Sequence, residues 1–330
     1  MEHKMQSMDY ISMTLTSKRF IVMQMPILHR SLKSPYCEKI MLLMGYLEQP
    51  YLSLITSKGI PRPVQELLVG NYSRRVPILQ IGADLFCDSE LIMQQLSILN
   101  DNSSLYKYPS TSAVEQWIKA IEIDGNTAIF GSIKPLELIC AYFKNMPPNH
   151  ALKFITDRAK LAKTVALPNN DLPFEEKELI AKRYLVDLDN QLSEHHFFFT
   201  DNAPTALDFT AYTMIYYLDI INKLKLAKEL HNLRKWYQRM SAIGTGHGKE
   251  VTDQVSLAAA LENPPAPIAA EYLKSSRIGQ EVTFKNKGFM SQMNEGVRGV
   301  IVGEDENRII LRRETIQTGV VHIHFPKLNY

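Results

Sequence analysis

The chain has 330 residues, of which 45% are hydrophobic and 22% are charged, as in an ordinary globular protein with a sizeable core. Its 37 Lys and Arg residues nearly balance its 35 Asp and Glu residues. The resulting net charge of +2 argues against a protein that binds nucleic acids or membranes through a generally basic surface. No apolar run approaches the roughly 20 residues that span a bilayer, so we expect no membrane segment.

Residues 1–18 are polar and rich in methionine, and we expect an N-terminal extension over residues 1–24, without a signal peptide. The three cysteines cannot form a full disulfide framework, which favours a reducing compartment, and we therefore expect a cytoplasmic protein.

Residues 25–100 alternate between strand and helix patterns and predict an α/β domain. Ser34-Pro35 has the residues preferred at the N-cap and first position of a helix. The other expected elements are a short apolar strand that closes at Ile27 and Leu28 in a periodic region beginning near Phe20, strands at 51–55, 76–81 and 85–87, a helix at 64–69, and a helix that begins at Asp88-Ser89.

From 111 to 245 the apolar residues recur at helical spacing, which predicts an all-helical domain. Thr205 and Asp208 have the spacing of a capping box, with Asp in place of the usual Glu. Residues 246–275 contain Gly-rich and Pro-rich breaks and are expected to be a linker with room for a short Ala-rich helix. Residues 276–330 predict a small all-β domain with strands at 281–285, 297–302, 308–313 and 320–325.

Three motifs give the first two regions a family resemblance. Ser34-Pro35-Tyr36-Cys37 follows the first strand, Val76-Pro77 precedes the third, and Asp88-Ser89 begins the next helix. In this order, and with the Thr205 and Asp208 box, they resemble glutathione S-transferases of the serine type. The resemblance covers about residues 25–245. It implies a thioredoxin-like domain followed by an all-α domain, and glutathione as co-substrate.

A narrower resemblance extends to nearly the whole chain. It is to a transferase-like subfamily of largely unassigned function whose members carry an extra C-terminal β unit. The segments that carry this resemblance are 60–63, 72–79, 81–82, 86–89 and 321–326.

In serine-type members, the residue matching Ser34 donates a hydrogen bond to the sulfur of glutathione. A hydrogen bond to a charged acceptor contributes roughly 1.5–3 kcal/mol. It therefore lowers the thiol pKa by roughly one to two units. The positive end of the helix acts in the same direction. The alternative is that Ser34 is only a helix N-cap.

The resemblance also implies how the rest of glutathione is held. A cis peptide bond before Pro77 lets Val76 pair with the cysteinyl backbone like an added strand; a trans proline at a strand start is the alternative. Ser89 and the helix start receive the γ-glutamyl carboxylate, and Asp88 receives its ammonium group. Asp88-Ser89 can equally be a helix N-cap, and both interpretations can hold together.

The glycine carboxylate of glutathione needs a cation. Lys58, Arg62, Arg74 and Arg75 are candidates, and Arg62 is included in the expected site. Arg74-Arg75 replaces the lead-in that the family usually has before this Val-Pro pair. A solvated basic turn is the alternative, so the sequence leaves the choice of cation open.

The cysteines and histidines suggest further chemistry. Because Ser34 replaces the first cysteine of a glutaredoxin-like motif, a dithiol mechanism is excluded there. Cys37 can act as a single redox thiol, although packing against the sheet is favoured, and Cys87 and Cys140 are expected to be apolar strand and helix-core residues. His195-His196 and His322-x-His324 offer too few ligands for a metal, so we expect surface histidines and no metal.

The sequence therefore favours a protein that binds glutathione and activates its thiol for attack on a small electrophilic or hydrophobic substrate. That substrate is expected near Trp117, Ile121 and Asp124. The resemblance implies a homodimer. Two alternatives remain: a non-enzymatic scaffold with the same fold, and a redox protein that uses Cys37. A nucleic-acid role for the β unit is disfavoured because aromatic residues for base stacking are few.

Overall fold

The computed structural model describes residues 25–57, 61–107, 117, 132–161, 172–220, 228–285 and 296–327. The described strands form one nine-stranded sheet in the order β5-β2-β1-β3-β4-β9-β8-β7-β6. Their bounds are β1 (Ile27–Arg30), β2 (Tyr51–Ile55), β3 (Ile78–Ile81), β4 (Asp84–Cys87), β5 (Gly248–Val251), β6 (Glu281–Phe284), β7 (Val297–Glu304), β8 (Arg308–Thr315) and β9 (Gly319–Pro326).

The centre of this sheet is the thioredoxin-like part. β1 pairs with β2 in parallel and with β3 antiparallel, and β4 returns antiparallel to β3. The strands bury side chains on both faces, because successive residues point to opposite sides. Leu79 and Phe86 enter one core, while Ile78 and Leu85 enter the other.

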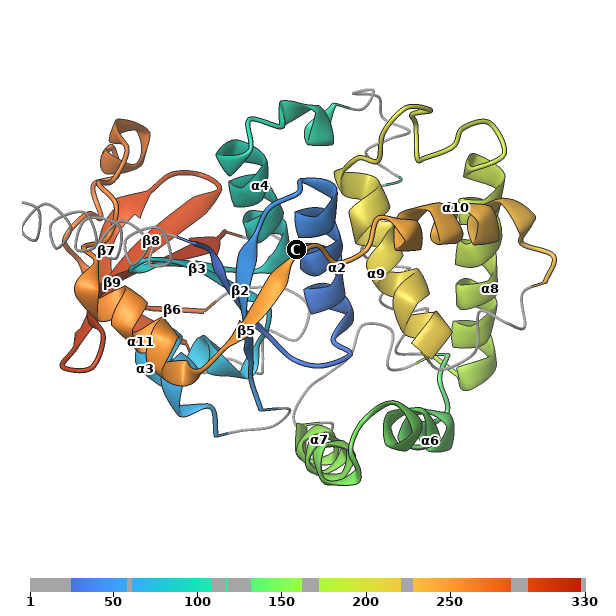
Figure 1. Cartoon of the computed structure of the whole chain (residues 1–330), viewed down its shortest axis with the longest axis horizontal. Coiled ribbons are helices and arrows are strands. Elements are labelled where there is room, and N and C mark those ends of the chain that lie inside the picture. The colour runs from blue at the N-terminus through green and yellow to red at the C-terminus, as the bar shows by residue number, and fades with distance from the viewer. Residues whose placement is uncertain are drawn as a thin grey trace, which may run out of the picture.

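Helices cover the two faces of this sheet. α2 (Pro35–Tyr46) and α4 (Ser89–Leu99) pack on the face that carries Leu79 and Phe86. α3 (Pro63–Val69) and α11 (Asp253–Glu262) cover the opposite face (Figure 1). The predicted α/β domain is therefore confirmed, including the start of α2 directly after Ser34.

The helical domain lies against α2 (Figure 1). Tyr46 of α2 meets Phe209 of α9 with ring centroids 5.7 Å apart. The described helices of this domain are α6 (Pro135–Asn145), α7 (Pro148–Leu161), α8 (Phe174–Gln191), α9 (Ala206–Ile220) and α10 (His231–Ala242). The remaining short helices are η1 (Gly70–Arg74), η2 (Ser103–Tyr106) and η4 (Ala270–Leu273).

Asp208 organises the start of α9. Its carboxylate accepts hydrogen bonds from the backbone N–H of Thr205 at 2.8 Å and from the Thr205 hydroxyl at 3.0 Å, as the capping-box spacing predicted. It also accepts from the Phe198 N–H and from the Trp236 indole, at 3.0 Å and 2.8 Å. Burial raises the pKa of Asp208 to about 6, although these four donors oppose the shift.

The chain leaves the helical domain by crossing α2. A Cβ atom on Gly45 would overlap the Gly244 carbonyl oxygen, so only glycine permits this approach. The chain then forms β5, which pairs in parallel with β2, and α11. Residues 246–275, expected to be a linker, therefore contain a sheet strand and a helix that covers the sheet.

A buried polar network fastens α11 to the sheet. The imidazole of His29 on β1 lies 2.9 Å from Gln80 Oε1 and 3.0 Å from Gln65 Nε2. Ser256 of α11 donates to the same Gln80 oxygen at 2.6 Å, and the Gln80 amide donates to the Ser256 carbonyl at 2.9 Å. These partners fit a neutral imidazole that donates at Nε2 and accepts at Nδ1. Burial lowers the pKa of His29 to about 4, and the hydrogen bond that His29 donates to Gln80 opposes this shift.

The strands expected at the C-terminus form, and they extend the same sheet. β9 pairs in parallel with β4, with Asp84 opposite His322 and Phe86 opposite His324. β8, β7 and β6 follow antiparallel, with a register shift between Ile301 and Gly303. The all-β unit is thus hydrogen-bonded to the thioredoxin-like sheet through β4.

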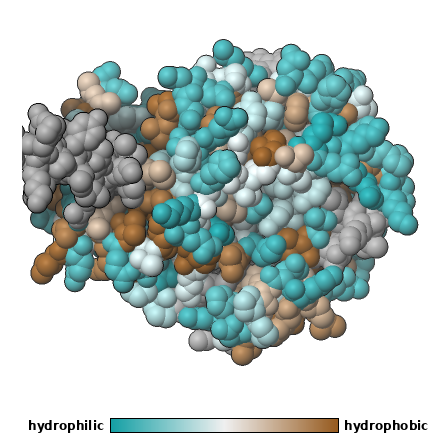
Figure 2. Space-filling model, viewed as in Figure 1, coloured by the Kyte–Doolittle hydropathy of each residue, from teal (hydrophilic) through white to brown (hydrophobic). Residues whose placement is uncertain are grey.

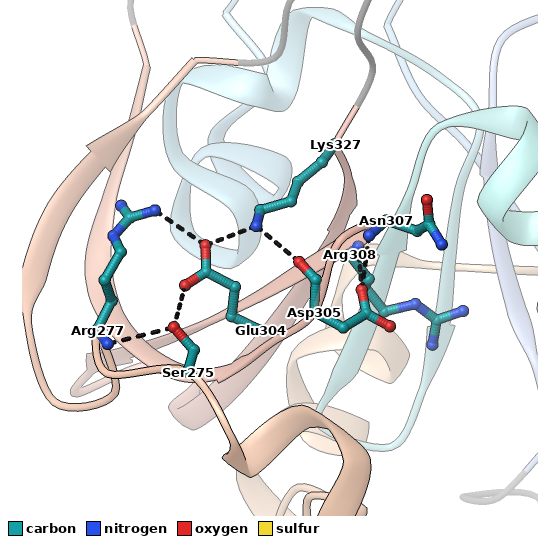
Figure 3. Close-up of polar contacts among 7 residues, drawn as sticks. All are labelled: Ser275, Arg277, Glu304, Asp305, Asn307, Arg308 and Lys327. Atoms are coloured by element: carbon teal, nitrogen blue, oxygen red, sulfur yellow. Dashed lines mark hydrogen bonds and ion pairs between the residues drawn. The ribbon is translucent and has the colours of Figure 1, made fainter.

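A buried carboxylate ties the end of β7 to its surroundings (Figure 3). Glu304 is 4% exposed and accepts from Ser275 at 2.6 Å, from Arg277 at 2.9 Å and from Lys327 at 2.8 Å. Lys327 also donates to the Asp305 carbonyl at 2.6 Å. Burial opposes the charge on Glu304, but the hydrogen bonds from Lys327 and Ser275 outweigh it and lower the pKa of Glu304.

The molecular surface differs between the two halves. On the face shown in Figure 2, apolar residues gather mainly over the sheet half, while the helical half is largely hydrophilic. Leu261 of α11 and Ile316 in the β8–β9 turn are 56% and 94% exposed. Of the helices in the described ranges, none has the length and apolar character needed to cross a membrane.

Candidate functional site

Ser34 lies at the N-terminal end of α2, beyond the end of β1. It is the N-cap residue, with extended backbone angles, and Pro35 occupies the first helical position. Its carbonyl accepts from the Glu38 N–H at 2.9 Å, but its hydroxyl makes no capping hydrogen bond. Ser34 is half-buried. A hydroxyl not used by its own helix therefore stands at the positive end of that helix.

Val76 and Pro77 lie at the start of β3. The peptide bond between them is cis, as predicted. Val76 is half-buried and Pro77 is buried. The strand that follows begins at Ile78 and pairs with His29 of β1.

Asp88 and Ser89 begin α4 as predicted. Asp88 is the N-cap, with a positive φ of 87°, and its Oδ1 accepts from the Glu90 N–H at 2.9 Å. Burial raises the pKa of Asp88, while the Glu90 N–H and the charges of Lys39 and Arg75 act in the opposite direction. The capping role is therefore real, and it employs one of the two carboxylate oxygens.

Arg62 has a structural role that the sequence did not reveal. It is 5% exposed, and its guanidinium donates to three carbonyl oxygens, those of Ser57 at 2.8 Å and of Ser73 and Arg74 at 3.0 Å each. These bonds fix the segment that leads into Val76. These atoms of Arg62 are thus engaged by the backbone, and the contact of Arg62 with glutathione stays a prediction.

The other three candidate cations have different surroundings. Arg75 lies against the Tyr72 ring, with its guanidinium carbon 5.5 Å from the ring centroid. Arg74 donates to the Asp157 carboxylate of α7 at 2.7 Å. Lys58 lies outside the described residues.

The cysteines divide by burial. Cys37 and Cys87 are both 0% exposed. Burial raises the pKa of Cys87 well above its usual value, and the Asp88 charge adds to that shift. The burial of both thiols and the raised pKa of Cys87 agree with packing roles for Cys37 and Cys87. Cys140 on α6 is exposed, so the prediction that it belongs to the helix core was wrong.

The expectation of surface histidines was wrong for the pair on β9. His324 is 7% exposed, its Nε2 lies 3.0 Å from Asp84 Oδ1, and its ring stacks on Phe86 at 4.4 Å. His322 is half-buried, 3.9 Å from the same oxygen. Burial lowers the pKa of both imidazoles, although Asp84 opposes it. His195 lies 3.3 Å from Asp201, and His196 is exposed.

Only one residue of the expected second-substrate site is described. Trp117 packs against Phe198 and Phe199, with ring centroids 5.8 Å and 6.1 Å away, while Ile121 and Asp124 lie outside the described residues. No group of three or more side chains suited to hold a metal occurs among the residues that the structure covers.

Sequence reasoning missed a polar cluster between α2 and α9. Glu38, in the first turn of α2, is hydrogen-bonded to Tyr216. Burial raises the pKa of Glu38, with Lys33 and Arg30 opposing. Tyr212 stacks on Tyr216 at 5.9 Å, one helical turn away. The spacing of the two tyrosines was visible in the sequence, but the partner of Glu38 was not.

The described residues thus combine a four-stranded α/β core, with a cis-proline before its third strand, and a helical domain with a capping box. Residues 28–104 match the glutathione S-transferase N-terminal domain family, and residues 175–239 match the glutathione S-transferase C-terminal domain family. The two regions are therefore similar to the N-terminal and C-terminal domains of glutathione S-transferases.

Solved structures share this fold. A GST-like protein from Pseudomonas syringae is 23% identical, with a TM-score of 0.65, and the match covers 92% of this chain and 97% of that one. A glutathione transferase from Phanerochaete chrysosporium is 12% identical, with a TM-score of 0.51, over 67% of this chain and 97% of that one. None of the curated proteins matches this chain. The first match shows that the shared fold extends beyond the two family regions.

Proposed function

We propose that this protein binds glutathione in its thioredoxin-like domain and activates the glutathione thiol for attack on an electrophile. The observation that carries the proposal is Ser34: its hydroxyl is not used to cap α2 and stands at the positive end of that helix. A hydroxyl and a helix start both favour a negatively charged sulfur.

The reaction follows from this placement. The Ser34 hydroxyl donates a hydrogen bond to the glutathione sulfur, and the thiol proton leaves to solvent. The thiolate then attacks the electrophile, so that a bond forms to sulfur as the leaving group departs with its electron pair. The hydrogen bond lowers the thiol pKa by roughly one to two units, which raises the thiolate fraction at neutral pH.

The other expected residues hold the rest of the ligand. Val76, presented by the bend at Pro77, pairs with the cysteinyl backbone. Ser89 and the N–H groups at the start of α4 receive the γ-glutamyl carboxylate. Asp88 receives the γ-glutamyl ammonium group with the carboxylate oxygen that does not cap α4. Because the charge of Arg75 acts on Asp88, we place Arg75 near this end of glutathione.

The proposal includes a cytoplasmic homodimer, as in the family that the sequence resembles. The three free cysteines support a reducing compartment. The second substrate is a small electrophilic or hydrophobic compound.

Calorimetric titration with glutathione tests the proposal, together with the ultraviolet absorbance of the thiolate. We expect Ser34→Ala to bind glutathione but to raise the pKa of the bound thiol by roughly one to two units. Ser34→Thr keeps the hydroxyl and is the matched control, with the pKa of the bound thiol close to that of the parent.

Two outcomes favour the alternatives. If millimolar glutathione releases no heat and leaves the melting temperature unchanged, the non-enzymatic scaffold is the better interpretation. If Cys37→Ser abolishes an activity that removes glutathione from proteins, the redox alternative is supported; full retention of that activity excludes it.

A further inference from the structure

One ion pair joins the proposed ligand site to a part of the chain outside both family regions. Arg74, two residues before Val76, donates from Nη1 to Asp157 Oδ1 of α7 at 2.7 Å. The two side chains are 24% and 13% exposed. The ion pair is therefore close to the molecular surface and partly shielded from water.

The other end of the α6–α7 pair is held by α9. The hydroxyls of Tyr142 on α6 and Tyr217 on α9 lie 2.8 Å apart, and the Asn145 amide donates to the Ile220 carbonyl at 3.3 Å. Figure 1 shows α6 and α7 together below α2 and α9. The two helices thus connect α9, in the helical domain, to the segment that leads into Val76. At that second end, Arg74 makes the ionic contact with α7.

Among the three candidate cations that the structure describes, Arg74 is the one that pairs with a side-chain carboxylate. Arg62 is committed to three backbone carbonyls. Arg75 lies against Tyr72, and its charge acts on Asp88. Arg74 instead pairs with a carboxylate from a separate element. Arginine binds carboxylates through a planar fork of N–H donors, and the glycine carboxylate of glutathione is the same chemical group as the Asp157 side chain.

We infer that Asp157 occupies, on Arg74, the position that the glycine carboxylate of glutathione takes when it binds. Glutathione then exchanges one carboxylate for another and releases α7 from the ligand site. This inference rests on the proposed function, and it assigns the glycine-end cation that the sequence left open.

The exchange has a thermodynamic consequence. Glutathione can use Arg74 only in the fraction of molecules in which Asp157 has left it. The apparent affinity for glutathione therefore equals the intrinsic affinity multiplied by that fraction. By linkage, glutathione must weaken the attachment of α7 by the same factor. A ligand without the glycine carboxylate does not compete with Asp157 for Arg74. Its affinity is therefore not lowered by Asp157, and it does not weaken the attachment of α7.

Two ligands and three variants of the full chain test this. The ligands are glutathione and its glycine monoethyl ester, titrated by calorimetry. We expect Asp157→Asn to bind glutathione about fivefold more tightly, the factor for a partly exposed ion pair of about 1 kcal/mol. The ester binds the parent and Asp157→Asn equally. Glu176→Gln, which removes an exposed carboxylate from α8, is the control and leaves both affinities unchanged.

Arg74→Gln tests the cation itself. We expect it to weaken glutathione binding about tenfold, the loss of a charge-assisted hydrogen bond, without changing the affinity for the ester. Hydrogen exchange supplies a second readout. Glutathione, but not the ester, speeds amide exchange in α7 of the parent, and Asp157→Asn shows faster exchange there without ligand.

The outcomes separate the two claims. If glutathione binds the parent and Asp157→Asn equally, or if it slows exchange in α7, the exchange of carboxylates is overturned while glutathione binding stands. If no variant binds glutathione or its ester, the proposed function fails and the inference fails with it.

Discussion

The central sheet is extended at both edges, and the two extensions are fastened in different ways. Beside β2, the added strand β5 is largely exposed, and the attachment is the buried network of His29, Gln80 and Ser256 under α11. Beside β4, the added strand β9 is largely buried, and its contacts to β4 include a carboxylate, Asp84, between two imidazoles.

The difference shows how each extension responds to its environment. The network under α11 is built from neutral groups and tolerates no added proton, because both nitrogens of His29 are already engaged. The β9 attachment contains a negative charge that favours protonated imidazole, and this charge partly offsets the effect of burial. Protonation is therefore expected to weaken both attachments, and a neighbouring carboxylate opposes that effect on the β9 side.

Among the predictions that compare the two attachments, acidification has the largest expected effect on the free energy of unfolding. The pKa of His29 is lowered from 6.5 to about 4, so below about pH 6.5 the unfolded chain binds a proton that the folded chain does not. The free energy of unfolding should fall by up to about 3 kcal/mol as the pH drops toward 4. Urea unfolding across this range measures it.

His29→Gln isolates the contribution of His29. His322 and His324 have lowered pKa values and titrate in the same direction, so some dependence should remain in this variant. A pH profile identical to that of the parent would show that His29 does not drive the effect.

Asp84→Ala tests the β9 side. It removes the acceptor of His324 and of the Ala266 N–H, which donates to Asp84 Oδ2 at 2.7 Å. We expect a loss of about 2 kcal/mol in the free energy of unfolding and faster amide exchange in β9. Asp201→Ala, which breaks the exposed pair with His195, is the matched control with little effect. Equal effects of the two substitutions would refute a special role for Asp84.

Ser256→Ala provides the smallest of the three effects. The hydroxyl bond to Gln80 is lost, but His29 still satisfies that oxygen, so we expect a loss of about 1 kcal/mol. Ser193→Ala is the control, since its hydroxyl makes an equally short 2.6 Å bond to the Asn190 carbonyl at an exposed site. Hydrogen exchange should change in α11 for the first variant and not for the second.

Local signals in the sequence predicted much of the fold. Ser34-Pro35 marked the start of α2, Asp88-Ser89 the start of α4, and Thr205 with Asp208 the start of α9. Each depends on residues within one helical turn, where residue preferences act directly. β5 carries no such signal, because its exposed residues become a strand only by pairing with β2.

The candidate site likewise contains residues that local motifs predict and residues whose contacts depend on distant parts of the chain. The order of the motifs located Ser34, Val76 and Asp88, but the surroundings of the four cations depend on contacts distant in the sequence. Arg62 reaches back to Ser57 and forward to Arg74, and Arg74 pairs with a residue 83 positions away. No local pattern encodes such partners, so the sequence offered four cations without a means to choose.

The pairing of β5 with β2 and of β9 with β4 has a practical consequence for protein engineering. A fragment that ends after α10 retains the matched regions but leaves the backbone N–H and C=O groups on both sides of its remaining strands without partners. Exposed edge strands of this kind can pair with strands of neighbouring molecules and promote aggregation. We therefore expect a fragment that ends after α10 to be less soluble than the full chain.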